Sequence, residues 1–309
     1  MIPVLVGVAV LIFTILHFTP GDPVIMILGR DSTVEAQEQL RASMGLDRPF
    51  PVQLLSYLRD VFLRFDLGVS YNTGKAVAEE ILFRFPYTFL LAFSSMVISL
   101  LIGIPLGVFA AVNQNKLGDR VSMLIALLGV SMPQFWVGLL LVLLLALHLR
   151  ILPPSGIGSP YHFILPIIAN AFGGIAGMAR QARSSMLEVI RSDYVATARA
   201  KGVSWINTIF RHALPNALIP VITVAGTSFG RSLGGTIVIE SVFSIPGIGA
   251  YMLSGINNRD YPIVQGCVVF LAITFSFIML LVDLMYAYVD PRIRAQYTGR
   301  GKKRRARRG

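Results

Sequence analysis

The sequence predicts an all-α polytopic membrane protein with six transmembrane helices, an extracytoplasmic helical lobe and a helical loop on the cytoplasmic side. Of its 309 residues, 54% are hydrophobic and only 14% are charged, and the mean hydropathy is +0.68. Six apolar segments reach the length of about 17 residues or more that a membrane-spanning helix needs. Basic residues are concentrated in alternate connecting segments, which is typical of chains that cross a membrane repeatedly. This composition excludes an ordinary soluble enzyme.

The six predicted spans each satisfy their backbone hydrogen bonds internally, as lipid requires. They are Ile2–Phe18, Tyr87–Val112, Val121–Leu149, Phe163–Ala179, Leu214–Ile239 and Ile263–Val289. The first apolar stretch has no small-residue cleavage site, so we interpret it as a span and not as a signal peptide. No basic residue precedes this stretch, which leaves a truncated or misassigned N-terminus as an open alternative.

The distribution of Lys and Arg predicts that both termini are cytoplasmic. The segments placed inside carry Lys116, Arg120, Arg180, Arg183, Arg191, Arg199, Lys201 and Arg211, and nine more basic residues follow Asp290. The opposite short loops contain only Arg150 and Arg259. The tail 290–309 is therefore expected in the cytoplasm, where it can contact anionic lipid. The net charge of +11 follows from this arrangement and does not indicate a nucleic-acid partner.

Residues 20–86, between the first two spans, are expected to form a small extracytoplasmic lobe. The segment opens with the Pro-Gly-Asp-Pro turn at Pro20. Ser32 and Glu35 have the spacing of a capping box, which predicts a helix that ends near Gly45. Two further helices are predicted at Pro51–Arg64 and Lys75–Phe85.

The loop 184–215 is polar, basic and helically patterned, although it lies between two long apolar segments. An apolar stripe recurs at Leu187, Ile190, Tyr194 and Ala198. Gly202 stands directly after Lys201, where a left-handed residue would end the helix. Ser204 is placed to cap a second short helix through Arg211. We therefore expect the loop 184–215 to form a rigid helix–Gly–helix elbow that a soluble partner can bind.

A charged side chain at membrane depth should face protein or a watery cavity, because contact with lipid is costly. Arg231 falls inside the fifth predicted span, and Thr227 and Gly234 share its helical face. One interpretation places these three residues along a pore. The alternative is a structural ion pair between Arg231 and Glu240. The small-xxx-small pair Gly103/Gly107 likewise indicates either close helix packing or a moving interface.

Little else in the sequence points to catalysis or to a bound cofactor. The sequence contains no GxxxxGK[ST] phosphate-binding loop. The chain therefore cannot itself power pumping across the membrane, and a separate ATPase would have to supply the energy for it. Ser131 and His148 raise the alternative of an intramembrane protease, but along one helix they would lie about 25 Å apart, beyond hydrogen-bond reach. The four histidines are scattered and Cys267 is alone, so no metal site and no disulfide is expected.

The loop 184–215 resembles the "EAA" loop of permease subunits in binding-protein-dependent ABC importers. Ala198, Gly202, Leu214 and Pro215 occupy the family's positions at the family's spacing. Ala196, Thr197 and His212 depart from the pattern. Further segments are similar to B-type permeases of dipeptide and oligopeptide importers, in the peptide/nickel branch. These segments are Pro20–Pro23, Asp66–Ser70, Pro86–Thr88, Glu240–Gly249, Arg259–Gly266 and Asp290–Arg294.

The resemblance implies a non-enzymatic permease subunit of the bacterial inner membrane that forms half of a translocation pathway for peptides. It also implies a second, similar permease as partner, two cytoplasmic ATPases that use ATP and Mg, and an extracytoplasmic substrate-binding protein, with no cofactor bound by this chain. In this coupling-helix loop, the residues expected at the ATPase are Asp193, Tyr194, Ala198, Lys201, Gly202, Trp205, Ile206, Leu214 and Pro215. Nickel chelates, glutathione and opines stay open as cargo, and a passive channel stays open as a rival class.

Overall fold

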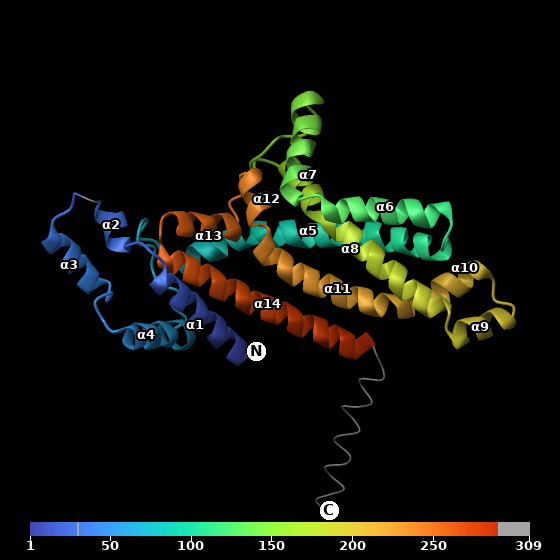
Figure 1. Ribbon diagram of the computed structural model, residues 1–309, viewed down its shortest axis with the longest axis horizontal. Coiled ribbons are helices and arrows are strands. Elements are labelled where there is room, and N and C mark those ends of the chain that lie inside the picture. Colours follow the sequence, from blue (N-terminus) through green and yellow to red (C-terminus); the bar gives the residue numbers. More distant parts are fainter. Residues whose placement is uncertain (30, 290–309) are drawn as a thin grey trace, which may run out of the picture. The chain divides into compact units, whose positions relative to one another are not determined.

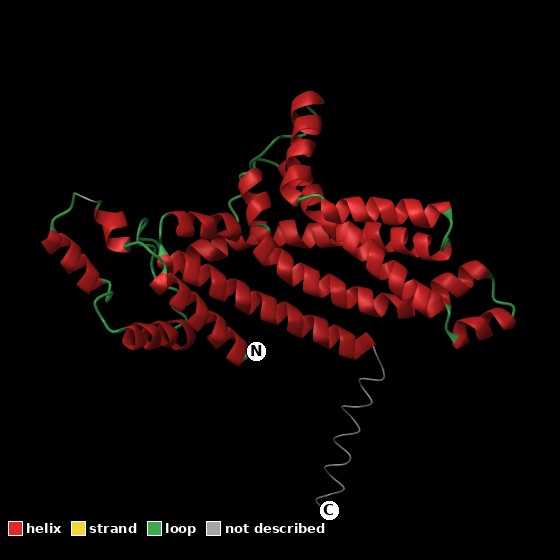
Figure 2. Cartoon of the chain, in the orientation of Figure 1, coloured by secondary structure: helices red, strands yellow, loops and turns green. Residues whose placement is uncertain are grey.

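The computed structural model describes residues 1–29 and 31–289, and this part of the chain is helical (Figures 1 and 2). Its described residues include no strand, only an isolated bridge between Val69 and Ala76. The all-α prediction is therefore confirmed. The basic tail and the Asp290–Arg294 motif lie outside the described residues.

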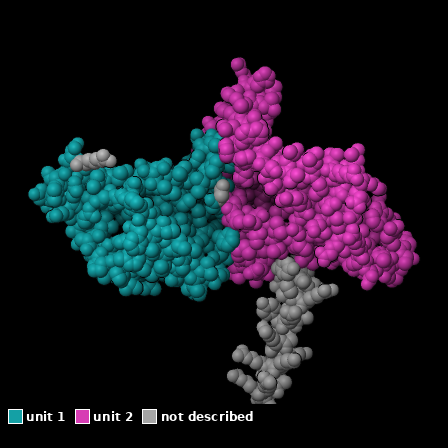
Figure 3. Space-filling view, in the orientation of Figure 1, with its two compact units in different colours: residues 1–90, 233–276 teal, residues 91–232, 277–309 magenta. Residues whose placement is uncertain are grey.

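The chain forms two compact units, which Figure 3 colours separately. Unit 1 comprises Met1–Leu90 and Leu233–Ser276, and unit 2 comprises Leu91–Ser232 and the chain from Phe277 onward. Unit 1 contains the N-terminal helix, the lobe and the segment that precedes and begins the last long helix. Unit 2 contains the elbow and most of the remaining long helices.

Four described helices are long and apolar enough to cross a membrane, and a bent pair can count as a fifth. The four are Val77–Val112, Pro160–Ile190, Trp205–Gly234 and Tyr261–Met285, and the bent pair is Leu117–Ser131 with Gln134–His148. The apolar helix α1 (Ile2–Phe18) has 17 residues and is shorter than each of those four helices, which have 25 to 36 residues. The prediction of several spans is thus confirmed, and the number six is not established.

The third predicted span is not one helix. α6 (Leu117–Ser131) and α7 (Gln134–Leu141), which continues into the π-helix η1 (Val142–His148), meet at an angle of 99°. Met132 has an extended backbone, with ψ of 126°. Its neighbour Pro133 disfavours the helical conformation in the preceding residue, and this breaks the helix.

The lobe in unit 1 is built from α2 (Pro23–Leu28), α3 (Val34–Ser43) and α4 (Phe50–Leu63). The predicted cap of α3 is wrong by one residue: the hydroxyl of Thr33 accepts the N–H of Ala36 at 3.3 Å. Ser32 instead donates to the carbonyl of Gly29. The predicted helix Lys75–Phe85 is not separate, because α5 (Val77–Val112) runs through Pro86 without a break. α4 packs against α1 around Ala9 and Val61.

Three sequence motifs of unit 1 meet at the start of α14 (Tyr261–Val289). They are Pro20–Pro23, Asp66–Ser70 and Arg259–Gly266. The carboxylate of Asp260, fully buried, accepts hydrogen bonds from the hydroxyl of Ser70 at 2.7 Å and from the backbone N–H of Asn72 at 3.1 Å. The Arg259 guanidinium packs over the α-carbon of Gly21, so a side chain at this position would have to displace it. These contacts fasten the lobe to the residues that precede the last long helix.

A second buried carboxylate organises the Glu240–Gly249 motif. Glu240, in α12 (Ile237–Val242), is fully buried, and its oxygens accept the hydroxyls of Thr88 and Thr236 at 2.7 and 2.9 Å. The N–H of Ala250, in the first turn of α13 (Ile248–Asn257), donates to it at 2.8 Å. Hydrogen bonds from three donors compensate for burying the carboxylate. Gly247 and Gly249 lie against Glu240, with no space for a side chain.

In unit 2, α8 (Ile164–Ile190) packs against α6, α7 and the second half of α5. A Cβ at Gly103 would meet the carbonyl oxygen of Ile175 at 2.7 Å, and one at Gly107 would overlap the backbone of Ala179. In this conformation the Gly103/Gly107 pair is a close-packing surface, as small residues allow between apolar helices.

Candidate coupling site

The elbow in unit 2 begins with two helices, where the sequence predicted one. α8 ends at Ile190, and α9 spans Asp193–Ala200 (Figure 1). Ser192 separates them with an extended backbone, and its hydroxyl donates to the carbonyl of Val189 at 2.6 Å. The predicted continuous stripe through Tyr194 is therefore wrong, because α9 starts a new helical phase.

α9 is anchored by a residue that the sequence pattern did not single out. Val195 is 1% exposed, whereas Tyr194 is 44% exposed. Val195 belongs to a buried apolar cluster with Val108, Ala111, Met186, Ile209, Ala213 and Ala217. Its neighbours four residues away are Arg191 and Arg199, so no apolar periodicity pointed to it.

Gly202 ends α9 in the left-handed conformation that the sequence predicted, with φ of +83°. Its N–H donates to the carbonyl of Arg199 at 2.9 Å, and the N–H of Val203 donates to the carbonyl of Ala198 at 3.2 Å. This pair of bonds is a Schellman motif. No atom lies within 4 Å of the position that a Cβ would take at Gly202. Glycine is therefore needed here for its backbone conformation and not for space.

The part of the elbow that follows Gly202, which we call its second arm, is continuous with the following long helix. α10 (Trp205–Asn207), the π-helix η3 (Thr208–Ala213) and α11 (Leu214–Gly235) follow one another, and Trp205–Gly234 forms one helix of 30 residues. The prediction of a separate short helix through Arg211 is wrong. Ser204 occupies the cap position, but its side chain makes no capping bond. The buried hydroxyl of Thr208 donates to the carbonyl of Ser204 at 3.0 Å instead.

Four large apolar side chains are exposed on this elbow, and we call them the elbow surface: Tyr194, Trp205, Ile206 and Phe210. Phe210, which is 59% exposed, was missed, although its spacing from Ile206 places both on one helical face. The guanidinium of Arg199 lies 4.9 Å from the Trp205 ring centroid, a cation–π contact that holds the ring in place.

The remaining predicted coupling residues surround the elbow surface with different exposure. Asp193, Lys201 and Gly202 are exposed, and so is Pro215, at the start of α11. Ala198 and Leu214 are half-buried. Leu214 also lines an apolar groove of about 340 Å³ between the end of α5 and the second arm, together with Ile104, Pro105, Val108, Phe109, Val112, Asn113, Trp205, Ile206, Ile209 and Phe210.

A buried ion pair supports the base of the elbow, and the sequence pattern did not reveal it. The guanidinium of Arg183, in α8, binds both carboxylate oxygens of Asp119, at 2.6 and 2.7 Å. The N–H of Asn115 also donates to Asp119 at 2.9 Å. The one signal in the sequence was that Asp119 is the acidic residue beside Lys116 and Arg120. The pair ties the first turn of α6 to the last two turns of α8.

The candidate pathway residues all belong to α11. Arg231 and Gly234 are exposed, and Thr227 is half-buried, its hydroxyl donating to the carbonyl of Val224 at 3.0 Å. Within the part of the chain that the structure describes, Arg231 makes no ion pair or hydrogen bond, and Glu240 is occupied by the three donors given above. Glu240 belongs to unit 1 and Arg231 to unit 2, so the structural pair and the pathway interpretation both stay predictions.

The protease alternative gains no support from the geometry of unit 2. The hydroxyl of Ser131 donates to the carbonyl of Leu127 at 2.9 Å, as serines in helices often do. The assumption that Ser131 and His148 share one straight helix is wrong, because the bend at Pro133 separates them. The described residues contain no group of three or more His, Cys, Asp or Glu side chains that could hold a metal ion.

Two family descriptions match the chain. Residues 103–295 match "Binding-protein-dependent transport system inner membrane component", and residues 1–92 match "Binding-prot-dependent transport system membrane comp, N-term". The first match alone covers more than half of the chain.

Named relatives are similar along almost their whole length. The dipeptide transport system permease protein DppB of Alkalihalophilus pseudofirmus is 41% identical, over 95% of this chain and 96% of the relative. The glutathione transport system permease protein GsiC of Salmonella choleraesuis is also 41% identical, with the same coverage. GsiC of Escherichia coli O6:H1 is 40% identical.

Solved structures share the fold. Inward-facing conformations of the MetNI methionine ABC transporter match with a TM-score of 0.59 and 18% identity, over 69% of this chain and 97% of the other. An amino acid ABC transporter solved with histidines matches with a TM-score of 0.52 and 15% identity, over 68% and 94% of the two chains. At such identities the likeness concerns the fold alone.

Proposed function

Since the chain belongs to the family of binding-protein-dependent transport system inner membrane components, and is a permease subunit of an ABC importer, we propose that it forms half of a translocation pathway for peptides. The relatives named for dipeptide and glutathione transport, each 41% identical, support this cargo class. Glutathione is itself a modified tripeptide, so it is the second candidate cargo. The chain is a multi-pass protein of the inner membrane.

We assign ATP hydrolysis to separate cytoplasmic subunits that use ATP and Mg, and we assign delivery of the peptide to an extracytoplasmic binding protein. A second, similar permease completes the pathway. In this assembly the chain moves solute and catalyses no reaction. Access to the solute site alternates as the permease pair changes between inward-open and outward-open states.

The elbow surface is the proposed contact with an ATPase subunit, and its exposure is the observation that carries this assignment. Trp205, Ile206 and Phe210 present large apolar side chains next to a turn fixed by Gly202. Aromatic and aliphatic anchors of this kind dominate the energetics of protein–protein contacts. The buried Val195 and the Asp119–Arg183 pair hold this surface on α8 and α5. Movement of the ATPases is therefore transmitted to the long helices.

The proposal is tested first by uptake. The permease pair, the ATPases and the binding protein are reconstituted in liposomes, and uptake of labelled dipeptide and of labelled glutathione is measured. We expect ATP-dependent uptake of at least one of the two. A conductance that needs no ATPase would contradict the proposal in favour of a passive channel.

The coupling contact is tested by substitution of the elbow surface. Ile206→Ser and Phe210→Ser each remove an exposed apolar anchor, and we expect each to weaken co-purification of the ATPases by about 1–2 kcal/mol, or roughly 5–30-fold. Leu63→Ser is the matched control, since Leu63 is 76% exposed but lies in the lobe. If all three variants retain the ATPases equally, the elbow surface is not the contact.

A further inference from the structure

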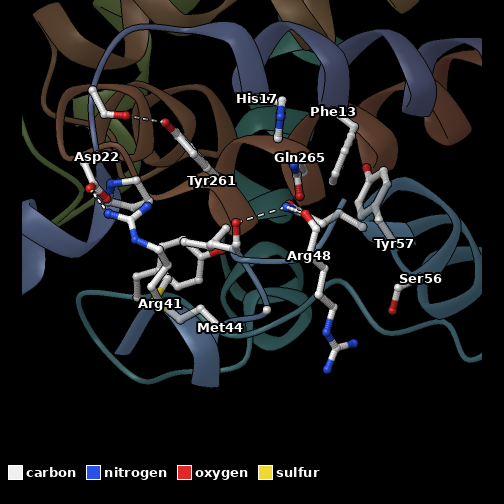
Figure 4. A pocket seen from close by; sticks show the side chains of 16 residues that line it. Phe13, His17, Asp22, Arg41, Met44, Arg48, Ser56, Tyr57, Tyr261 and Gln265 are labelled. Atoms are coloured by element: carbon white, nitrogen blue, oxygen red, sulfur yellow. Dashed lines mark hydrogen bonds and ion pairs between the residues drawn. The ribbon is translucent and has the colours of Figure 1, made fainter. Parts of the chain in front are cut away.

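A pocket of about 430 Å³ lies in unit 1, at the lobe (Figure 4). Its size falls within the range of about 300–1,000 Å³ that is usual for sites of small ligands. The pocket is walled by the end of α1, the start of α2, the segment from α3 to α4 and the start of α14. Its lining residues are Phe13, His17, Gly21, Asp22, Pro23, Arg41, Met44, Gly45, Leu46, Arg48, Gln53, Ser56, Tyr57, Tyr71, Tyr261 and Gln265.

One wall of this lobe pocket carries polar groups that lack partners. The hydroxyl of Tyr57 is buried and has no hydrogen-bond partner among the described residues. The side-chain amide of Gln265 likewise makes no hydrogen bond within the described part of the chain. The amide nitrogen of Gln53 donates to the carbonyls of Leu46 and Arg48, which leaves its oxygen free. Buried polar groups in proteins normally have partners, so the Tyr57 hydroxyl indicates that a ligand supplies one. The half-buried amides of Gln265 and Gln53 offer that ligand further hydrogen bonds.

These groups match the chemistry of a peptide bond. An amide offers one donor and one acceptor, and the side chains of Gln265 and Tyr57 can each donate and accept. The hydroxyl of Tyr57 is protonated near neutral pH and can serve as a donor, and burial raises its pKa further. The rings of Phe13 and Tyr57 stack at 5.2 Å on the same side and provide an apolar surface for a side chain.

The charges of the lobe pocket favour an anion. Asp22 is already occupied, since it accepts the N–H of Val24 at 3.0 Å and pairs with Arg41. Arg48 has no ion-pair partner in the described ranges and stands at the rim (Figure 4). A guanidinium binds a carboxylate with particularly favourable geometry. The pocket thus has one cation without an ion-pair partner among its lining residues, on the exposed side chain of Arg48.

We propose that the lobe pocket binds a di- or tripeptide through its free C-terminal carboxylate and one backbone amide. The choice of a peptide among small amide-containing carboxylates rests on the proposed function. In the transport cycle this site would hold the peptide at the permease before it enters the pathway.

The test uses the complex of both permeases and the ATPases in lipid nanodiscs, without binding protein. Calorimetric titration compares alanyl-leucine with alanyl-leucinamide, which lacks the carboxylate. We expect the dipeptide to bind and the amide to bind about ten-fold more weakly, as loss of a charge-assisted bond implies. Arg48→Gln should abolish this difference. Tyr57→Phe and Gln265→Leu should each weaken dipeptide binding several-fold, and the double variant should abolish it.

Gln37→Leu is the matched control, because Gln37 is a lobe glutamine that bonds only to Ser32 and does not line the pocket. Absence of dipeptide binding, equal binding of the amide, or binding by the double variant at the level of Gln37→Leu would each overturn the inference. If the variants weaken association with the binding protein but leave dipeptide binding unchanged, the pocket receives the binding protein and the inference is wrong.

The same preparation separates this inference from the proposed function. Loaded binding protein is added, and stimulation of ATPase activity by peptide is measured. Normal stimulation with no calorimetric binding would refute the lobe pocket alone. Absence of stimulation by any peptide or by glutathione would refute the proposed cargo class itself.

Discussion

At the scale of single residues, Gly202 sets the conformation of the elbow. Its φ of +83° lies in the left-handed region, which costs a residue with a side chain about 1–2 kcal/mol. The sequence was sufficient to predict this, because glycine directly after the last helical turn has one common structural explanation.

Replacing Gly202 by valine should disturb coupling without preventing membrane insertion. Valine resists positive φ, so the turn should open, and we expect peptide-stimulated ATPase activity to fall roughly 5–30-fold, in line with that conformational cost. Gly74→Val is the control, since Gly74 also has positive φ (+67°) and open space around it, but lies in the lobe. Normal stimulation and uptake by Gly202→Val would contradict the assigned role.

Thr88 is a second residue with a measurable role. Its hydroxyl donates to Glu240 at 2.7 Å and accepts the N–H of Ile248 at 2.9 Å. Thr88→Val should leave both partners short of a hydrogen bond and cost about 1–3 kcal/mol. This should appear as a lower melting temperature of the purified complex.

Thr14→Val is the matched control for this substitution. The Thr14 hydroxyl bonds only to the carbonyl of Val10 in its own helix, at 2.7 Å, so little change is expected. Equal shifts in melting temperature for Thr88→Val and Thr14→Val would show that the Glu240 cluster adds no stability.

At the scale of helices, the sequence predicted most segments but not their junctions. Pro86 lies within the continuous helix α5, whereas Pro133 coincides with a sharp bend. Both prolines remove a hydrogen bond, and tertiary packing decides whether the helix continues. Packing is also what buries Val195 in place of Tyr194. The spacing of apolar residues shows which face of a single helix is buried. It does not show where one helix ends and the next begins.

The Asp119–Arg183 pair should be an energetic link between two helices. We expect Asp119→Asn and Arg183→Gln each to destabilise the complex, with a coupling energy of about 1–3 kcal/mol in a double-mutant cycle, because a bidentate, charged hydrogen bond is lost. Peptide-stimulated ATPase activity should fall in parallel.

The exposed pair Arg59–Asp60 provides the control for this cycle. Its side chains are 51% and 32% exposed, and exposed pairs contribute about 0–1 kcal/mol. Arg59→Gln should therefore have little effect. A coupling energy near zero for Asp119 and Arg183 would show that the pair does not support the elbow.

At the scale of the whole molecule, the family could be predicted from the order of short motifs along the chain. Segments such as Pro20–Pro23 and Arg259–Gly266 are weak signals alone, yet unit 1 brings them together at Gly21 and Arg259. The lobe pocket could not be predicted in this way, because its walls come from segments that are remote in sequence. Moreover, the polar side chains of the pocket that lack a hydrogen-bond partner can be identified only when all hydrogen bonds of the folded chain are known.

The predicted orientation can be checked with single cysteines. The chain contains one cysteine, Cys267, which is buried, so Cys267→Ser provides the background. In intact spheroplasts a membrane-impermeant maleimide should label Glu35→Cys in the lobe, and should label Lys201→Cys only after permeabilisation. Both positions are exposed in the structure. Labelling of Lys201→Cys from outside would invert the orientation and exclude contact with cytoplasmic ATPases.

The unbroken helix from Trp205 to Gly234 has a torsional consequence. Its 30 residues rise about 45 Å at 1.5 Å per residue, and no loop lies between the elbow and Arg231 to absorb twist. Rotation of Trp205 about the helix axis should therefore rotate the guanidinium of Arg231 about the same axis by a similar angle. Under the proposed function, torque from the ATPases at one end would thus change the direction in which a fixed positive charge points at the other end, and the solute would meet a different electrostatic potential in each state.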